Sequence, residues 1–176
     1  LSGTVGFITD KLTQGIPLSR AIEEAQKNGY TEPDFRDDLS GLDVARKLVI
    51  LAREAGNRVD IEDIVIEAFL PAEYFTIRDP EQCLLKIKEK LDAEMAERYE
   101  KGKKWKQTFR YLATFIRKKG EKPELKIALS QVRLDSAFGR LAGTDNRIEI
   151  VTGKYPKDGP YKLEGPGAGL DITASV

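Results

Sequence analysis

The segment from Thr31 to Lys47, TEPDFRDDLSGLDVARK, gathers ionisable side chains where a loop turns into a helix. They are five carboxylates and three cations: Glu32, Asp34, Asp37, Asp38, Asp43, Arg36, Arg46 and Lys47. Asp43 and Lys47 are four residues apart, so a helix puts them on one face with the acid nearer the N-terminus, as the helix dipole favours. On an exposed face, such a pair contributes only ~0.3–0.5 kcal/mol to stability.

Two chemical roles would go beyond an exposed ion pair. A lysine partly buried among carboxylates is a candidate acid/base, because burial and neighbouring charge tune its pKa. Several carboxylates together could also bind a substrate ammonium group, because they satisfy its charge and its N–H donors. A calcium loop is not indicated, since counting from Asp34 puts Arg36 at the third position and no glycine at the sixth.

Two other segments suggest binding functions that the pattern alone does not favour. The glycines of GPGAG, residues 165–169, could let backbone amides approach a phosphate or a flat ring. The dinucleotide fingerprint needs glycine where this chain has Leu170, so a tight turn is the simpler interpretation. The basic and aromatic residues of 101–119 could stack nucleic-acid bases. Aromatics at period two are ordinary strand residues, however, and the lysines would fall on the other face.

Composition limits the classes of function. The chain has 176 residues, of which 40% are hydrophobic, which predicts one domain with a sizeable core. Its 29 basic and 29 acidic residues balance, so no global charge favours nucleic acid or a membrane surface. With no histidine and one cysteine, Cys83, it lacks the usual zinc ligand sets and Ser-His or Cys-His nucleophiles. We predict no metal site and a cytoplasmic location, and no apolar run reaches the ~20 residues of a membrane span.

The elements that must position these residues are mainly helical in the first half. Val5, Ile8 and Leu12 share a helical face, and GIP at 15–17 ends that helix. Ser19 is predicted to cap a second helix that runs to about residue 28. After a charged loop over residues 30–39, a largely buried third helix is predicted from Leu42 to about residue 55.

The second half mixes helix and strand. A short strand is predicted over residues 64–69, followed by a helix that Asp79 caps and that runs to about residue 100. Alternating apolar residues predict a hairpin from strands at 105–115 and 125–129, with two more short strands at 147–152 and 161–165. The predicted fold class is α+β, with the helices of the N-terminal half packed on an antiparallel or mixed β-sheet.

Residues 25–47, AQKNGYTEPDFRDDLSGLDVARK, closely resemble the signature of homoserine dehydrogenase, including the bifunctional aspartokinase–homoserine dehydrogenases. SGTVGFI at 2–8 resembles the family's Asn/Ser-Gly-Thr helix start, and GPGAGLDITA at 165–174 resembles its late glycine motif. The resemblance covers essentially the whole chain. One departure is Phe35, where the family usually has a second proline.

The resemblance implies a dehydrogenase that interconverts L-homoserine and L-aspartate 4-semialdehyde with NAD or NADP, in threonine, methionine and isoleucine biosynthesis. It implies that Lys47 is the acid/base. The implied substrate-binding residues are Glu32, Asp38, Asp43, Thr4 and Tyr30. Gly169 matches the glycine that touches the nicotinamide end of the cofactor, and Gly167 belongs to the same motif.

Residues 1–176 then resemble a substrate-binding and dimerisation domain that lacks the Rossmann half. We expect the nucleotide-binding domain to precede Leu1 in a longer polypeptide, this fragment to be inactive alone, and the protein to be a homodimer that binds neither nucleic acid nor membrane. From the residues alone, two other functions stay open. One is a non-enzymatic oligomerisation module that pairs subunits through the sheet, and the other is a nucleic-acid binder that uses residues 101–119.

Overall fold

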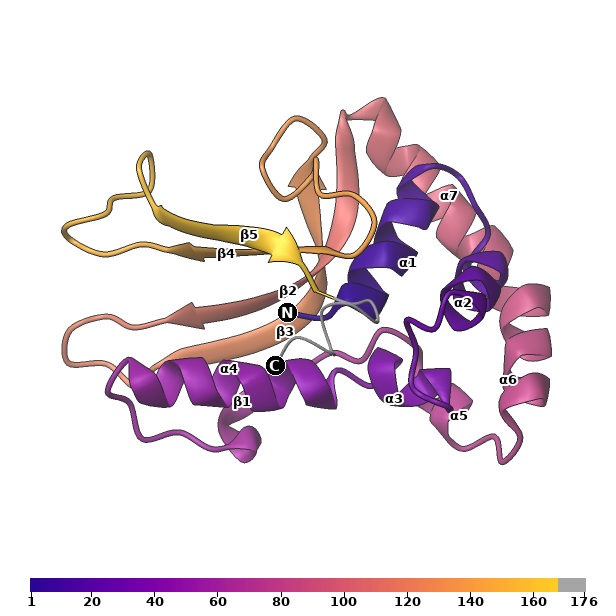
Figure 1. The fold of residues 1–176 in the computed structure, drawn as a ribbon, viewed down its shortest axis with the longest axis horizontal. Coiled ribbons are helices and arrows are strands. Elements are labelled where there is room, and N and C mark those ends of the chain that lie inside the picture. The colour runs from indigo at the N-terminus through magenta and orange to yellow at the C-terminus, as the bar shows by residue number, and fades with distance from the viewer. Residues whose placement is uncertain (168–176) are drawn as a thin grey trace.

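The computed structural model describes residues 1–167, in which helices pack beside a three-stranded sheet and a separate two-stranded hairpin (Figure 1). The strands are β1 (Ile64–Ile66), β2 (Gln107–Ile116), β3 (Glu124–Arg133), β4 (Asp145–Ile150) and β5 (Tyr161–Pro166). Central β3 runs parallel to β1 and antiparallel to β2, so the sheet is mixed. β4 and β5 pair antiparallel with each other. The predicted α+β class is confirmed.

The first two helices are α1 (Gly3–Thr13) and α2 (Leu18–Lys27). Ser2 caps α1, because its side-chain oxygen accepts a hydrogen bond from the Val5 N–H at 3.3 Å. The predicted cap of α2 is wrong, since Pro17 holds that position and Ser19 is buried. The N–H and hydroxyl of Ser19 donate to the two carboxylate oxygens of Asp92, at 2.8 and 2.6 Å, and tie α2 to a later helix.

The predicted charged loop contains a short helix, α3 (Phe35–Leu39), which precedes α4 (Leu42–Glu54). Asp34 caps α3 by accepting from the Arg36 N–H at 3.0 Å. Phe35 is 1% exposed and anchors α3 in the core. The inward residues of α4 are Val44, Ala45, Leu48, Val49 and Ala52. α4 is less buried than predicted, because Leu42 and Leu51 remain 44% and 42% exposed.

The remaining helical elements are η1 (Ile61–Asp63), α5 (Ala72–Phe75), α6 (Pro80–Lys86), η2 (Ile87–Leu91) and α7 (Asp92–Lys104). α6, η2 and α7 follow one another directly, and η2 is a π-helical turn. Asp79 caps α6 as predicted, accepting from the Glu81 N–H at 2.9 Å. The long helix continues past the predicted end at Glu100, and Trp105, predicted to lie in a strand, ends it with 78% exposure.

Two clusters of apolar side chains stabilise these layers. One joins α1, α2, α3 and the long helix, and Ile8, Ile22 and Ile87 are fully buried in it. The other lies between α4 and the sheet, where Leu48 packs near Leu125 and Ile127. Burying each such side chain contributes about 1.5–3 kcal/mol. None of the described helices has both the length and the apolar character required to cross a membrane.

Candidate functional site

The predicted acid/base pair lies on the first turns of α4. Lys47 Nζ donates to Asp43 Oδ2 at 2.7 Å and to the Leu1 carbonyl oxygen at 3.1 Å. The side chains of Lys47 and Asp43 are 47% and 52% exposed, so about half of the Lys47 side chain remains in contact with solvent. Within residues 1–167 these are the two acceptors that the ammonium reaches, and its third N–H can donate to a ligand oxygen.

Asp38 connects three segments beside this pair. Its Oδ1 lies 2.9 Å from the Thr4 hydroxyl on α1, and its Oδ2 accepts from the Glu32 N–H at 2.9 Å. The Thr4 hydroxyl also makes a short contact with the Tyr30 carbonyl oxygen. The structure therefore brings together four of the residues that the sequence singled out: Thr4, Tyr30, Glu32 and Asp38.

Burial raises the pKa of the Asp38 carboxyl, and the negative charges of Glu32 and Asp43 raise it further. The hydrogen bond from the Glu32 N–H acts in the opposite direction, as does a hydrogen bond from the Thr4 hydroxyl when Asp38 is ionised. Because Asp38 is only partly buried, a small ligand can reach it from solvent. An ammonium group placed here would lie near the carboxyl group of Asp38 and the carboxylates of Glu32 and Asp43.

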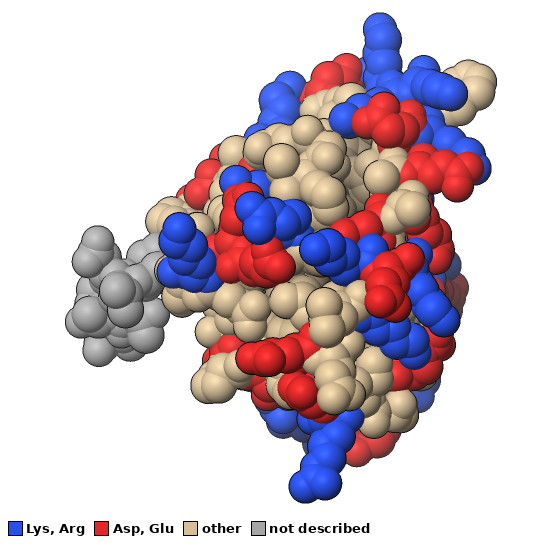
Figure 2. Space-filling model, turned by 90° about the vertical axis from the view of Figure 1, so that its right-hand side faces the viewer, with Lys and Arg blue, Asp and Glu red and all other residues tan. Residues whose placement is uncertain are grey.

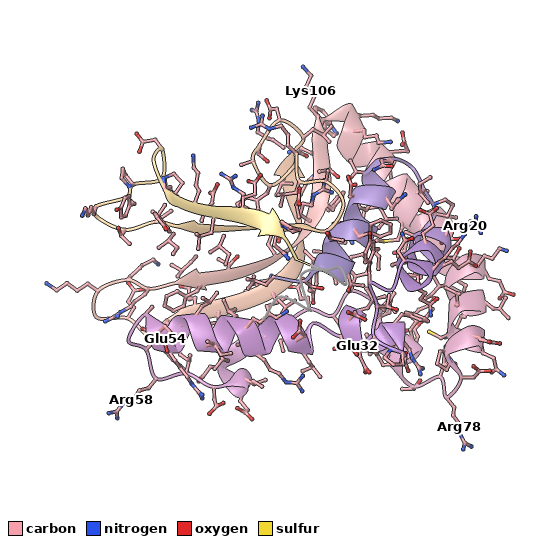
Figure 3. The ribbon with its side chains drawn as sticks, in the orientation of Figure 1. Arg20, Glu32, Glu54, Arg58, Arg78 and Lys106 are labelled. Atoms are coloured by element: carbon pink, nitrogen blue, oxygen red, sulfur yellow. The ribbon has the colours of Figure 1, made fainter. Side chains whose placement is uncertain are left out.

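The side chain of Glu32 is exposed, beside α3 and the start of α4 (Figure 3). The Tyr30 ring packs edge-to-face on Phe7, with ring centroids 5.2 Å apart, which fixes the loop that carries Glu32. The predicted residues thus share one open face at the N-terminal ends of α1, α3 and α4 (Figure 1).

Gly41 and Tyr111 set the position of α4, and sequence reasoning missed both. Gly41 is the N-cap of α4 with φ of 81°, a left-handed conformation that favours glycine. A Cβ there would lie 2.4 Å from Tyr111 Oη. Tyr111 Oη in turn donates to the Glu67 carbonyl oxygen at 2.8 Å. The sequence signal for Gly41 was its position just before a predicted helix. No sequence signal indicated that Tyr111 on β2 would contact it.

The late glycine motif is only partly described. Gly169 lies outside the described residues. Gly167 is described, and a Cβ at this position would fall 1.5 Å from Asn146 Nδ2, so that space is taken by the chain itself. The described residues therefore provide no ready cradle for a dinucleotide. Among residues 1–167, no group of three or more acidic, cysteine or histidine side chains could hold a metal ion.

A cavity of about 690 Å³ lies between α4, β2 and β4, and Leu1, whose carbonyl oxygen accepts from Lys47 Nζ, is part of its wall. Val44, Leu48 and Phe115 contribute apolar walls, and Arg110 and Arg147 also line it. None of the side chains of Glu32, Asp38, Asp43 and Lys47 lines this cavity. It therefore offers no enclosed pocket to the predicted acid/base pair.

The basic segment at 101–119 reaches this region through Tyr111, beside Gly41, and not through its lysines that form ion pairs. Lys106 projects into solvent at the turn between α7 and β2, far around the surface from Glu32 (Figure 3). Acidic and basic side chains are interspersed over the face that Figure 2 shows, and Lys101 and Lys103 pair with Glu97 and Glu100 at 2.6 and 2.7 Å. This mixture of charges disfavours an extended nucleic-acid surface on that face.

Solved structures share this fold. A Candida auris protein of unknown function superposes with a TM-score of 0.84 and 28% identity, over 99% of this chain and 48% of that one. Staphylococcus aureus homoserine dehydrogenase gives a TM-score of 0.75 at 20% identity, over 99% of this chain and 39% of that one. The second likeness concerns the fold alone.

Sequence relatives give the family. The bifunctional aspartokinase/homoserine dehydrogenase of Buchnera aphidicola is 38% identical over 175 residues, which cover 99% of this chain and 21% of that protein. The chloroplastic bifunctional protein of Daucus carota is 34% identical, over 98% of this chain and 18% of that protein. The chain thus spans about a fifth of the length of these curated relatives. A family model described as homoserine dehydrogenase matches residues 1–176, and the chain therefore belongs to the homoserine dehydrogenase family.

Proposed function

We propose that residues 1–176 are the substrate-binding and dimerisation domain of a homoserine dehydrogenase that interconverts L-homoserine and L-aspartate 4-semialdehyde. The observation that carries this proposal is the bond of 2.7 Å between Lys47 Nζ and Asp43 Oδ2, one helical turn apart and beside the Asp38 network. An amino-acid substrate has an ammonium group and, in homoserine, a hydroxyl group. This face offers carboxylates for the first and a lysine for the second.

In this proposal, Glu32, Asp38 and Asp43 bind the substrate ammonium, with Thr4 and Tyr30 holding Asp38 and its loop in place. Lys47 exchanges a proton with the substrate oxygen through the N–H that Asp43 and Leu1 leave free. Asp43 fixes the direction of the Lys47 side chain, because the bond spans one turn of a rigid helix. The pathway role in threonine, methionine and isoleucine synthesis, and a cytoplasmic location, belong to the same proposal.

NAD or NADP would accept the hydride that homoserine loses, and its reduced form would return a hydride to the semialdehyde in the reverse direction. We assign its binding to a nucleotide-binding domain outside these residues, since the described chain provides no dinucleotide cradle. The coverage of about a fifth of the bifunctional relatives supports a longer polypeptide. Gly169 and Gly167 remain proposed contacts of the nicotinamide end, and the chain alone is proposed to be inactive.

We also propose that the protein forms a homodimer. A substrate domain that dimerises would also serve as the oligomerisation module considered above. The side chains on the face of the β2–β3 pair that points away from α4 form a shallow hollow of about 160 Å³, lined by apolar and by polar or charged residues: Leu112, Ile116 and Ala128, with Thr114, Glu124, Lys126 and Ser130. Ile116 is 44% exposed there. An exposed sheet face of this kind is stabilised by a second copy that covers it.

The deciding experiment compares two lysines in matched ion pairs within the full-length polypeptide. Lys101 pairs with Glu97 at 2.6 Å with the same four-residue spacing, but it is more exposed, at 69% against 47%, and lies far from the site. Lys47→Ala should lower homoserine-dependent reduction of NAD or NADP by ~10²-fold or more, because it removes the proton-transfer group. Lys101→Ala should leave turnover unchanged.

Near-normal turnover in Lys47→Ala would remove this residue from the acid/base role. Equal losses in both variants would show that the effect comes from general damage to surface ion pairs. Calorimetry with homoserine provides a second readout. Binding should persist in Lys101→Ala and be lost in Asp43→Asn, which keeps the side-chain shape but removes the negative charge that binds ammonium.

A further inference from the structure

The oxygen atoms around Thr4 do not have enough hydrogens for their contacts if Asp38 is ionised. Thr4 Oγ1 contacts the Tyr30 carbonyl oxygen and lies 2.9 Å from Asp38 Oδ1. A carbonyl oxygen and a carboxylate oxygen are both acceptors, and the hydroxyl has a single hydrogen. One hydrogen cannot fill both contacts, and the Tyr30 carbonyl has no hydrogen to donate, so both contacts are hydrogen bonds only if Thr4 donates to Tyr30. The contact with Asp38 then needs a hydrogen from the carboxyl group.

The other carboxyl oxygen does not supply the missing hydrogen. Asp38 Oδ2 accepts from the Glu32 N–H at 2.9 Å, a bond that a carboxylic acid and a carboxylate can both accept. With Asp38 protonated at Oδ1, the chain of donors is complete: Asp38 donates to Thr4, and Thr4 donates to Tyr30. A hydrogen then lies in each of the two contacts, the one between Asp38 and Thr4 and the one between Thr4 and Tyr30.

The charges facing Asp38 favour the same state. The loop before α3 contributes the Glu32 carboxylate and α4 contributes the Asp43 carboxylate, whereas α1 contributes only the neutral Thr4. On α3 itself Arg36 is bound to Asp34 in a bidentate pair and Asp37 is exposed. Within residues 1–167 Asp38 makes no ion pair, and Lys47 is paired with Asp43.

We propose that Asp38 is a carboxylic acid in the ligand-free site and releases its proton to water when a substrate ammonium group binds between it, Glu32 and Asp43. This inference rests on the proposed function for the identity of the ligand. The arriving cation stabilises the ionised carboxyl, so the proton leaves as the ammonium binds. The affinity for ammonium therefore rises with pH through the range in which Asp38 titrates, since proton and ammonium compete for one carboxyl group.

The proton on Asp38 also has a consequence in the absence of ligand. A carboxyl whose pKa is raised in the folded state contributes stability that is present below its unfolded pKa and is lost as pH rises through its folded pKa. Asp38→Asn imitates the protonated acid at every pH, because its amide oxygen can accept from the Glu32 N–H while its NH₂ donates to Thr4. The variant should therefore gain in stability relative to the wild type as pH rises.

The first measurement is the midpoint of unfolding of the ligand-free protein from about pH 4, near the pKa of an aspartate in the unfolded chain, to about pH 8. The matched control is Asp37→Asn, an exposed neighbour on the same helix without these contacts. We expect the difference between Asp38→Asn and wild type to grow toward the higher pH, in favour of the variant. Asp37→Asn should show no such growth. A pH-independent difference for Asp38→Asn, or the same trend in both variants, overturns the proton assignment.

The second measurement is titration calorimetry of the wild-type full-length protein with homoserine in two buffers of different ionisation enthalpy. We expect net release of a proton on binding, and tighter binding at about pH 8 than at about pH 5. Homoserine binding without proton release overturns the coupling and leaves the proposed function intact. In the reverse result, Asp38→Asn gains stability with rising pH but the protein does not bind homoserine. That result refutes the proposed function and the ammonium step, and it leaves the proton assignment on Asp38 intact.

Discussion

Replacing Gly41 with alanine tests whether a contact with the sheet sets the start of the helix that carries Asp43 and Lys47. Gly41 has φ of 81°, and an alanine in the left-handed region costs about 1–2 kcal/mol. Its Cβ would lie 2.4 Å from Tyr111 Oη, closer than real Cβ contacts allow, so the phenol must move. Moving it weakens the bond of 2.8 Å to the Glu67 carbonyl, which contributes about 0.5–1.5 kcal/mol.

The expected loss of stability for Gly41→Ala is therefore about 2–3 kcal/mol, from backbone strain and the displaced phenol together. The other end of α4 provides a matched control. Gly56 has φ of 79°, and a Cβ there meets nothing within 4 Å. Gly56→Ala should show the strain alone, about 1–2 kcal/mol. Urea denaturation measures both free energies of unfolding.

A third variant separates the two causes. Tyr111→Phe removes the hydroxyl that would collide with the new Cβ, while the ring carbon at 3.4 Å makes an ordinary contact. In that background Gly41→Ala should cost less than in the wild type and approach the cost of Gly56→Ala, with Ile66 Cγ2 at 3.1 Å from the new Cβ as the remaining close contact. This gives a favourable coupling of about 0.5–1.5 kcal/mol in a double-mutant cycle. Equal costs for Gly41→Ala in both backgrounds would refute the collision. Equal costs for Gly41→Ala and Gly56→Ala in wild type would do the same.

Two further predictions concern the fold and the assembly. Arg110→Met should lower the free energy of unfolding by more than about 3 kcal/mol, because several buried carbonyl oxygens would lose their donor. The guanidinium donates to the carbonyl oxygens of Thr9, Phe138, Gly139 and Leu141. A loss below about 1 kcal/mol in urea denaturation would contradict that role. Ile116→Glu should convert the proposed dimer to monomer in sedimentation experiments without loss of helix content. Leu85→Glu should not, although Leu85 on α6 is the more exposed apolar position, at 61% against 44%. An unchanged dimer in Ile116→Glu would exclude this face of the sheet as its interface.

Long periodic segments allowed the sequence to predict much of the fold. The stripe on α4, the face of Cys83, Ile87, Leu91 and Met95, and the pairing of β2 with β3 follow from periods that a sequence records directly. Short elements carry too few residues to show a period. That is why α3 and α5 were missed, and why Ser19 was taken for a helix cap when its partner is Asp92, far along the chain.

By itself, the sequence determined the acidic segment, the four-residue spacing of Asp43 and Lys47 and the family, because these depend on residue order and on local helix geometry. Only the tertiary structure decided that the Thr4 hydroxyl meets Asp38 and Tyr30, that Tyr111 limits Gly41 to glycine, and that Lys47 is half exposed. Those facts depend on how α1, α3, α4 and β2 pack. Packing brings together atoms whose separation in the chain leaves no local pattern to read.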